Sequence, residues 1–155
     1  MPEEELKSLI TDEHRAIVGV KSEPQTVVAK EEDVRRMRET IGDTDPRWAE
    51  GTGIAPPYII ATFGGGRPSR NMPFILPGGL LTQQEWKFTR PIRIGETLTA
   101  ISQVSDIRER LGGRYGYSVL MTTTTDYFDA GGNHVAAQLT TITQFDPKRA
   151  QGGNE

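Results

Sequence analysis

Long stretches of alternating apolar and polar residues fill the second half of the chain. They span residues 81–90, 97–108, 115–128 and 134–145, and they are rich in threonine, valine, isoleucine and aromatic residues. A period of two places the apolar side chains on one face of a strand, and β-branched and aromatic residues favour strands. The pattern therefore predicts four long strands, each with one buried face.

The first half of the chain shows the longer period of an amphipathic helix. Over residues 31–41 the apolar positions recur at helical spacing between charged ones, and Gly42 follows. This predicts a surface helix that ends at Gly42. The β-branched run over residues 25–29 predicts a short first strand, and residues 3–10 predict a short N-terminal helix. The helical arginines at positions 35, 36 and 38 fit a solvated face, so we assign them no role.

A segment rich in proline, glycine and aspartate separates the two halves. After it, Pro56 and Pro57 are placed to start a helix that runs to Phe63, where the glycines at 64–66 end it. The connections between the long runs contain the glycines typical of antiparallel neighbours, which predicts a meander. Strands this long must twist and curl. The predicted fold class is α+β, with a curled antiparallel sheet around the helix over residues 56–63.

Composition limits the number of domains and the class of partner. A chain of 155 residues with 35% apolar content fits one domain, which we place at residues 1–146. The polar tail over residues 147–155 is expected to be disordered. The net charge of -3 provides no basic surface for nucleic acid or an anionic membrane. The absence of cysteine excludes disulfides, thiolate metal sites and a cysteine nucleophile.

No targeting pattern is visible at the beginning of the chain. The first residues are acidic and lack the basic and apolar regions of a signal peptide, and no apolar run is long enough to span a bilayer. We therefore expect a soluble, cytoplasmic protein with no membrane partner.

Several short motifs occur in a fixed order along the chain. They are the loop Gly-Asp-Thr-Asp-Pro-Arg-Trp over residues 42–48, the run Ile-Ala-Pro-Pro-Tyr over 54–58, Trp-Lys-Phe-Thr-Arg-Pro over 86–91, and Gly-Glu-Thr-Leu over 95–98. In this order and spacing they resemble the N-terminal type of hot-dog domain in the MaoC-like hydratase and dehydratase family. The resemblance covers about residues 17–145.

The resemblance carries expectations about fold, assembly and activity. It implies a hot-dog fold, in which a long central helix is wrapped by the sheet, and side-by-side pairing of two such domains into one continuous sheet. It implies hydration of enoyl thioesters or dehydration of 3-hydroxyacyl thioesters, on CoA or a carrier protein, with no cofactor and no metal. The family loop reads roughly Gly-Asp-x-x-Pro-x-His, so Asp43 matches its aspartate while Trp48 stands at the histidine position.

The chain offers no obvious replacement for that histidine. The reaction needs a base, an acid and a donor that polarises the thioester carbonyl. The two histidines lie in a charged N-terminal segment (His14) and in a predicted hairpin (His134), and we interpret both as surface residues. We therefore name no catalytic residue. Without that histidine, Asp43 is interpreted as a loop residue that accepts bonds from backbone amides. Trp48 is interpreted as a residue that either plugs the mouth of the site or packs against the partner subunit.

Substrate contacts are predicted around the central helix. The candidates are the residues at the helix entry and two arginines after the glycines: Ile54, Ala55, Pro56, Pro57, Tyr58, Arg67 and Arg70. Helix N-termini favour polar or anionic groups, and a glycine-rich loop with arginines suits phosphate, although a plain connector is the preferred interpretation of that loop. The apolar loop over residues 72–80 either lines an acyl tunnel or packs against a neighbour.

Three hypotheses remain open from the sequence. The leading one is a noncatalytic hot-dog subunit that shapes the acyl tunnel for bulky substrates, fatty acyl or steroid side chain, beside a catalytic Asp-His subunit. The second is a homodimeric hydratase or thioesterase with an atypical acid-base set, using Asp43, or Asp45 with Tyr58. The third is a nonenzymatic module that binds acyl-CoA.

Overall fold

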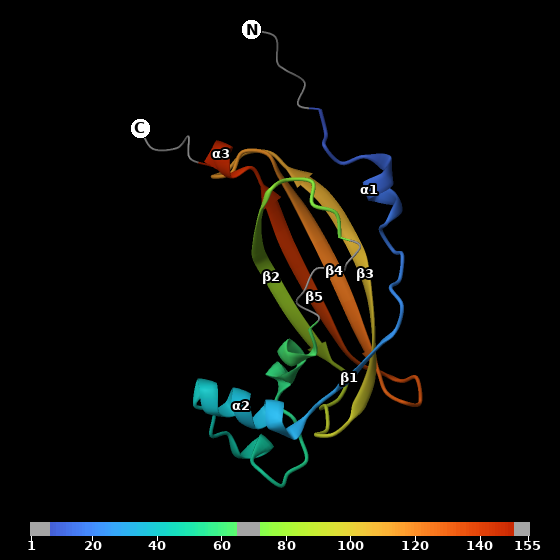
Figure 1. Ribbon diagram of the computed structural model, residues 1–155, viewed down its shortest axis with the longest axis vertical. Coiled ribbons are helices and arrows are strands. Elements are labelled where there is room, and N and C mark those ends of the chain that lie inside the picture. The colour runs from blue at the N-terminus through green and yellow to red at the C-terminus, as the bar shows by residue number, and fades with distance from the viewer. Residues whose placement is uncertain (1–6, 65–71, 151–155) are drawn as a thin grey trace.

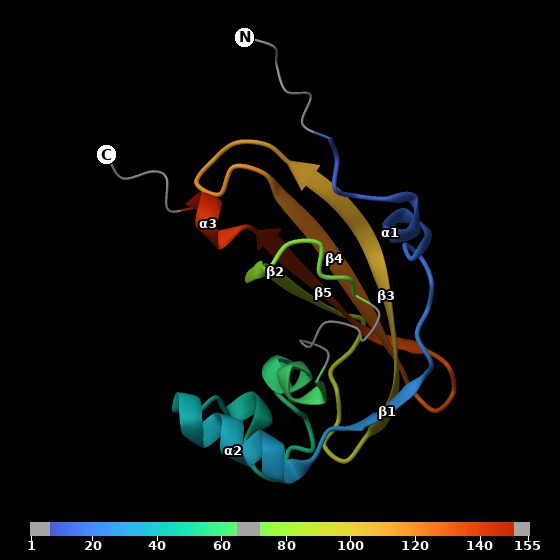
Figure 2. The same ribbon diagram turned by 45° about the horizontal axis from the view of Figure 1, so that its top comes forward.

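A five-stranded antiparallel sheet dominates the computed structural model, which describes residues 7–64 and 72–150. The strands are β1 (Gln25–Val28), β2 (Gly78–Phe88), β3 (Thr97–Arg110), β4 (Ser118–Phe128) and β5 (His134–Phe145). The helices are α1 (Asp12–Ala16), α2 (Glu31–Ile41), the 3₁₀ helices η1 (Pro46–Trp48) and η2 (Pro57–Phe63), and α3 (Pro147–Ala150). Figures 1 and 2 show α2 at one end of the sheet and α1 beside β3.

The strand order is β1-β3-β4-β5-β2, with every neighbouring pair antiparallel. The four long strands are confirmed, and β3, β4 and β5 form the predicted meander. The expectation that β2 and β3 are neighbours is wrong, because β2 pairs with β5 on the far side of the sheet. The connection through Pro91 and Gly95 therefore crosses the end of the sheet instead of turning a hairpin.

The predicted first strand and surface helix are confirmed as β1 and α2. Gly42 ends α2 in the left-handed region, at φ 67°, where its N–H donates to the carbonyl oxygens of Arg38 and Glu39. The N-terminal helix is misplaced in our prediction: residues 7–10 are not helical, and residues 1–6 lie outside the described ones. The helix α1 begins later because the Thr11 hydroxyl accepts a bond from the N–H of His14 and caps it.

The central helix is short. We expected a long helix, but η2 has seven residues and 3₁₀ geometry. Its length follows from the sequence around it, because prolines precede its first turn and Gly64 adopts a left-handed φ of 74° directly after it. Ile59 and Ile60 are nevertheless fully buried against the sheet. The α+β hot-dog arrangement is thus present, with a shorter helix than predicted.

Two separate apolar clusters form the core on the concave face of the sheet. The first surrounds η2 and contains Ala29, Val34, Ala55, Ile59, Ile60, Ile92, Leu98, Ala100, Tyr127, Val135 and Ala136. The second lies toward the other end of the sheet and contains Ile10, Met72, Val104, Ile107, Tyr117, Val119 and Met121. Met72 brings part of the predicted apolar loop into this second cluster. We also expected disorder from residue 147, but the residues 147–150 form the helix α3.

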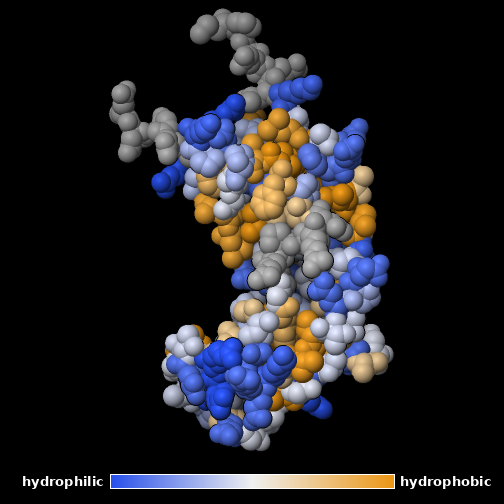
Figure 3. All heavy atoms as spheres, in the orientation of Figure 1, coloured by the Kyte–Doolittle hydropathy of each residue, from blue (hydrophilic) through white to orange (hydrophobic). Residues whose placement is uncertain are grey.

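The two edges of the sheet differ. Along β3, the outer edge is covered by β1 and by bridges from Val18 and Lys21. The opposite edge is β2, which has no neighbour among the described residues on its outer side and exposes Leu81 to 56%. Figure 3 shows apolar surface along the half of the molecule that contains β2 and hydrophilic surface over α2. Among the described residues, no helix is both long and apolar enough to cross a membrane.

Candidate functional site

The loop after α2 is shaped by the glycine that ends the helix. The left-handed conformation of Gly42 reverses the chain, and the N–H of Asp43 donates to the Arg38 carbonyl oxygen at 2.9 Å. A residue with a Cβ adopts this conformation only at a cost, so the turn explains why glycine stands here. The Asp43 side chain is thereby directed toward η1 and η2.

Asp43 accepts hydrogen bonds from three donors. They are the indole Nε1–H of Trp48 at 2.6 Å, the hydroxyl of Tyr58 at 2.6 Å and the backbone N–H of Asp45 at 2.9 Å. The bond from Tyr58, followed by those from Asp45 and Trp48, lowers the pKa of the Asp43 carboxyl. The backbone bond agrees with the predicted loop role of Asp43, whereas the bonds from Tyr58 and Trp48 were not foreseen.

The pKa of Tyr58 is shifted in the opposite direction from that of Asp43. Burial, followed by the hydrogen bond to the Asp43 carboxylate and its negative charge, raises the pKa of the phenol to about 12. An acid or base works best when its pKa lies near the working pH. A tyrosine that holds its proton so firmly and a carboxyl that loses its proton so readily are both poorly matched to proton transfer near neutrality.

Asp45 is not brought to Tyr58. Its carboxylate forms an ion pair with Arg47 at 2.6 Å and also accepts the backbone N–H of Arg47, which caps the helix η1. The Arg47 side-chain bond is the first cause that lowers the pKa of Asp45, to about 2. The guanidinium of Arg47 in turn lies 4.3 Å from the centre of the Trp48 ring. The Asp45–Tyr58 version of the homodimer hypothesis therefore has no support from the geometry.

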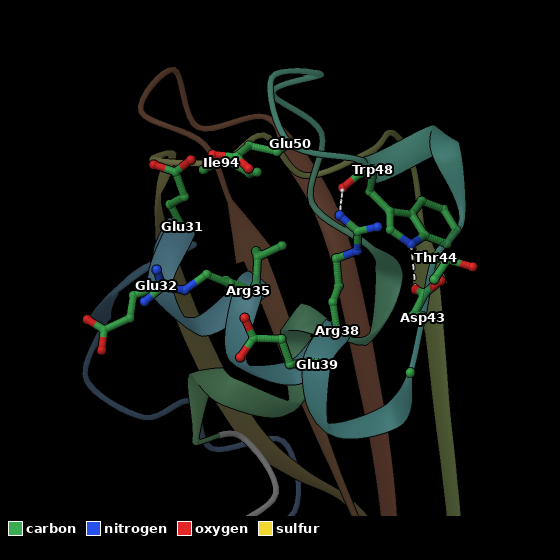
Figure 4. A pocket seen from close by; sticks show the side chains of 12 residues that line it. Glu31, Glu32, Arg35, Arg38, Glu39, Asp43, Thr44, Trp48, Glu50 and Ile94 are labelled. Carbon is green, nitrogen blue, oxygen red and sulfur yellow. Dashed lines mark hydrogen bonds between the residues drawn. The ribbon is translucent and has the colours of Figure 1, made fainter.

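A cavity of about 700 Å³ lies between α2 and this loop. Its walls come from both elements and from Ile94: Glu31, Glu32, Val34, Arg35, Arg38, Glu39, Gly42, Asp43, Thr44, Trp48 and Glu50. In Figure 4 the Arg38 side chain reaches across to the Trp48 carbonyl oxygen, to which it donates at 3.0 Å. Arg38, to which we assigned no role from the sequence, thus braces the loop, and its place one turn before Gly42 is a usable signal for this.

The predicted helix-entry residues divide into core and surface positions. Ala55 and Pro56 are buried, Tyr58 is half-buried, and Ile54 and Pro57 are exposed. The N–H of Ala55 donates to the carbonyl oxygen of Ile92, which fixes the entry against the core. The predicted arginines Arg67 and Arg70 lie outside the described residues.

Neither histidine reaches the loop. The ring of His14 accepts the N–H of Thr11 at the start of α1. His134 lies on the β4–β5 hairpin, where its ring bonds Asp126 at 2.8 Å and Thr89 at 3.2 Å. Within the described ranges no group of three or more acidic or histidine side chains is arranged to hold a metal ion. The loop therefore presents a held carboxylate without an imidazole beside it.

Solved structures share this fold at low sequence identity. One protein of the ChsH1-ChsH2 complex from Mycobacterium tuberculosis is 20% identical, with a TM-score of 0.66 over 83% of this chain and 90% of that one. A chain of the HadBC (3R-hydroxyacyl-ACP dehydratase) complex from the same organism is 17% identical, with a TM-score of 0.60 over 82% and 96%. A MaoC-like dehydratase is 21% identical, with a TM-score of 0.70 over 91% of this chain but 44% of that longer one.

Sequence comparison gives the family. No curated protein matches the chain in sequence. The family described as FAS1-like, dehydratase domain region, matches residues 16–138, which include the loop after α2, η2 and most of the sheet. The chain therefore belongs to the FAS1-like dehydratase domain family, and it has the hot-dog fold of the MaoC-like dehydratases.

Proposed function

We propose that this chain is a noncatalytic subunit of an enoyl-thioester hydratase or 3-hydroxyacyl-thioester dehydratase. A second hot-dog subunit supplies the aspartate and histidine, and this chain shapes the space for the acyl group. The substrate is a fatty-acyl or steroid side-chain thioester of CoA or of a carrier protein. The membership of a dehydratase domain family supports the reaction class.

The observation that carries the proposal is the bonding of Asp43. Its carboxylate is occupied by Trp48, Tyr58 and the Asp45 amide, and the residue at the histidine position is the tryptophan that donates to it. A general base works best when its pKa lies near the working pH, whereas these bonds lower the pKa of Asp43. Asp43 instead ties the loop to η2, which is a structural role.

The unpaired edge of β2 is evidence for pairing with a second subunit. Unpaired strand edges that carry exposed apolar residues favour pairing with another chain, and proteins that stay single usually cover or charge them. The opposite edge of this sheet is covered, while β2 exposes Leu80 and Leu81. Two of the structurally similar proteins were solved as complexes, ChsH1-ChsH2 and HadBC. We infer that β2 is where the catalytic subunit pairs.

We place the acyl chain near the interface with the partner along β2, with the residues 54–58 at the thioester end. The exposed Leu80 and Leu81 give this edge an apolar surface. An apolar lining distinguishes neighbouring methylenes only weakly. The proposal therefore names the class of substrate and leaves fatty-acyl and steroid side-chain groups as alternatives.

Turnover by separate and combined subunits tests the proposal. The chain is expressed alone and with the hot-dog protein of the neighbouring reading frame, chosen for a complete Gly-Asp-x-x-Pro-x-His loop, and hydration of dodecenoyl-CoA is followed by absorbance. We expect activity in the mixture and none in the chain alone. Turnover by the purified chain alone would favour the homodimeric enzyme. Binding without turnover in the mixture would favour the acyl-CoA-binding module.

A further inference from the structure

A polar belt crosses the concave face of the sheet between the two apolar clusters. Its members come from three adjacent strands and face the interior: Ser102, Thr123, Thr125, Gln138 and Thr140. All except the half-buried Ser102 are at least 94% buried. Strand register aligns them, because Ser102 lies opposite Thr125, Thr125 opposite Gln138, and Thr123 opposite Thr140. A belt of this kind is unusual in an interior, where polar groups need partners.

One side of the belt is satisfied from within the protein. The hydroxyls of Ser102 and Thr125 are 2.8 Å apart, and the Thr123 hydroxyl makes a weak contact with the sulfur of Met72 at 3.9 Å. Gln138 uses its amide oxygen to accept the hydroxyl of Tyr127 at 3.2 Å. The atoms toward β3 and β4 therefore have partners.

On the side of the belt toward β2, polar atoms lack hydrogen-bond partners among the described residues. Gln138 Nε2 and Thr140 Oγ1 are shielded from solvent and have no hydrogen-bond partner among the described residues. The same holds for Nε1 of Trp86, which lies directly opposite Gln138 in the β2–β5 register. Residues opposite each other in an antiparallel pair have Cβ atoms about 4.5–5.5 Å apart, so Trp86 and Gln138 are close neighbours. Thr140 lies two residues along β5 from Gln138 and therefore on the same face. Their position is next to the bare edge and to the cluster around η2.

The three unpaired groups are best matched by a hydrogen-bond acceptor. An indole nitrogen can only donate, the amide nitrogen of Gln138 donates because its oxygen is already used, and a threonine hydroxyl can donate or accept. We propose that Trp86, Gln138 and Thr140 bind an oxygen atom carried on the acyl chain beyond C3, a ketone or hydroxyl in addition to the groups that react. The inference rests on the proposed function and narrows its substrate to oxygenated acyl groups.

Binding by the isolated chain tests this inference. The probes are decanoyl-CoA and a panel of its analogues, each with one ketone at a different chain position. The chain has two tryptophans, so its indole N–H signals in a two-dimensional NMR spectrum belong to Trp48 and Trp86. We expect at least one ketone to shift the Trp86 signal downfield and to bind about tenfold more tightly than decanoyl-CoA, as one added hydrogen bond predicts. The Trp48 signal, bonded to Asp43, serves as the internal control.

The variant Trp86→Phe removes the donor and keeps an aromatic ring. It should bind the ketone and decanoyl-CoA with equal affinity, so that the preference for the ketone is lost; unchanged NMR dispersion would show that the variant is folded. The inference is overturned if no analogue shifts the Trp86 signal, or if Trp86→Phe still prefers the ketone over decanoyl-CoA. It is also overturned if only water is bound to Trp86, Gln138 and Thr140. Binding here needs no catalytic partner, so the inference can fail while the turnover test of the proposed function succeeds, and the reverse.

Discussion

Trp48 stands at the position of the family histidine, and the only polar atom of its side chain donates to Asp43. Replacing it by phenylalanine keeps an aromatic ring but removes one of the three donors to the carboxylate. We expect Trp48→Phe to lower the melting temperature by a few degrees in calorimetry, because a partly buried carboxylate loses a hydrogen bond. The matched control is Trp86→Phe, whose indole nitrogen has no partner among the described residues. A larger loss in the control would contradict the role given to Trp48.

Asp43 should also make stability depend on pH. Its pKa in the folded state is below the ordinary value of 3.8, because it accepts bonds from Tyr58, Asp45 and Trp48. At acidic pH the folded protein therefore binds fewer protons than the unfolded chain at this site. The stabilisation is present above the ordinary pKa and is lost as the pH falls through the lower folded value.

The variant Asp43→Asn isolates this effect. At pH 7 it should melt below the parent chain, and the difference should shrink as the pH falls from about 4 toward 2. Asp45 and Glu96, whose pKa values are also lowered, are present in both proteins, so their contributions cancel in the difference. Melting curves of both proteins at several pH values measure this difference in melting temperature. A difference that stays constant down to pH 2 would show that folding does not lower the pKa of Asp43.

At the scale of the element, the end of α2 depends on one backbone conformation. Gly42 has a φ of 67°, and a Cβ there meets no atom within 4 Å, so the cost of alanine is conformational and not steric. We expect Gly42→Ala to lower the free energy of unfolding by about 1–2 kcal/mol in urea titration. The control Gly79→Ala lies in a strand with ordinary φ, where a Cβ only touches Ile142. Equal losses of unfolding free energy in Gly42→Ala and Gly79→Ala would argue against the role of the left-handed turn.

The strand β2 provides the element-scale test of pairing. Leu81→Asp puts a charge on the bare edge and should weaken the complex with the catalytic subunit by at least about tenfold, which sedimentation measures. Leu111 is 60% exposed against 56% for Leu81, but it follows β3, which is separated from β2 by both β4 and β5. The control Leu111→Asp should leave the complex intact. If both substitutions act alike, pairing does not use β2.

Elements were predictable from the sequence where the signal is local. The helical spacing before Gly42 gave α2 with its observed bounds, and the alternation from His134 to Phe145 gave β5. The neighbours of β2 were not predictable, because pairing with β5 joins residues far apart in sequence, and Pro91 and Gly95 before β3 are compatible with either a hairpin or a crossing. The length of η2 was overestimated because the resemblance supplied a long helix, although Gly64 marked its end.

At the scale of the whole molecule, the sequence led to the fold class and to the absence of a histidine beside Asp43, while the contacts of the loop required the structure. Nothing in the residue pattern ties Trp48 to Asp43 or Tyr58 to the same carboxylate, since these contacts arise when η2 docks beside the end of α2. The polar belt was equally hidden. Four threonines follow one another in β4, and threonine and glutamine are mixed with apolar residues in β5, so only the register shows which of them share the buried face.

A division of labour between two subunits makes a sharp prediction about turnover. If the partner supplies the acid and base, Asp43→Asn in this chain should change the kcat of the assembled enzyme by less than about threefold, because Asp43 holds the loop and moves no proton. The matched change in the partner's loop, aspartate to asparagine, should reduce kcat by about 10²–10⁴-fold, the usual contribution of general acid-base catalysis. Steady-state hydration kinetics of the two assemblies, each verified as intact by sedimentation, measure both. A loss of the larger size from Asp43→Asn would place Asp43 in the reaction and contradict the noncatalytic role of this chain.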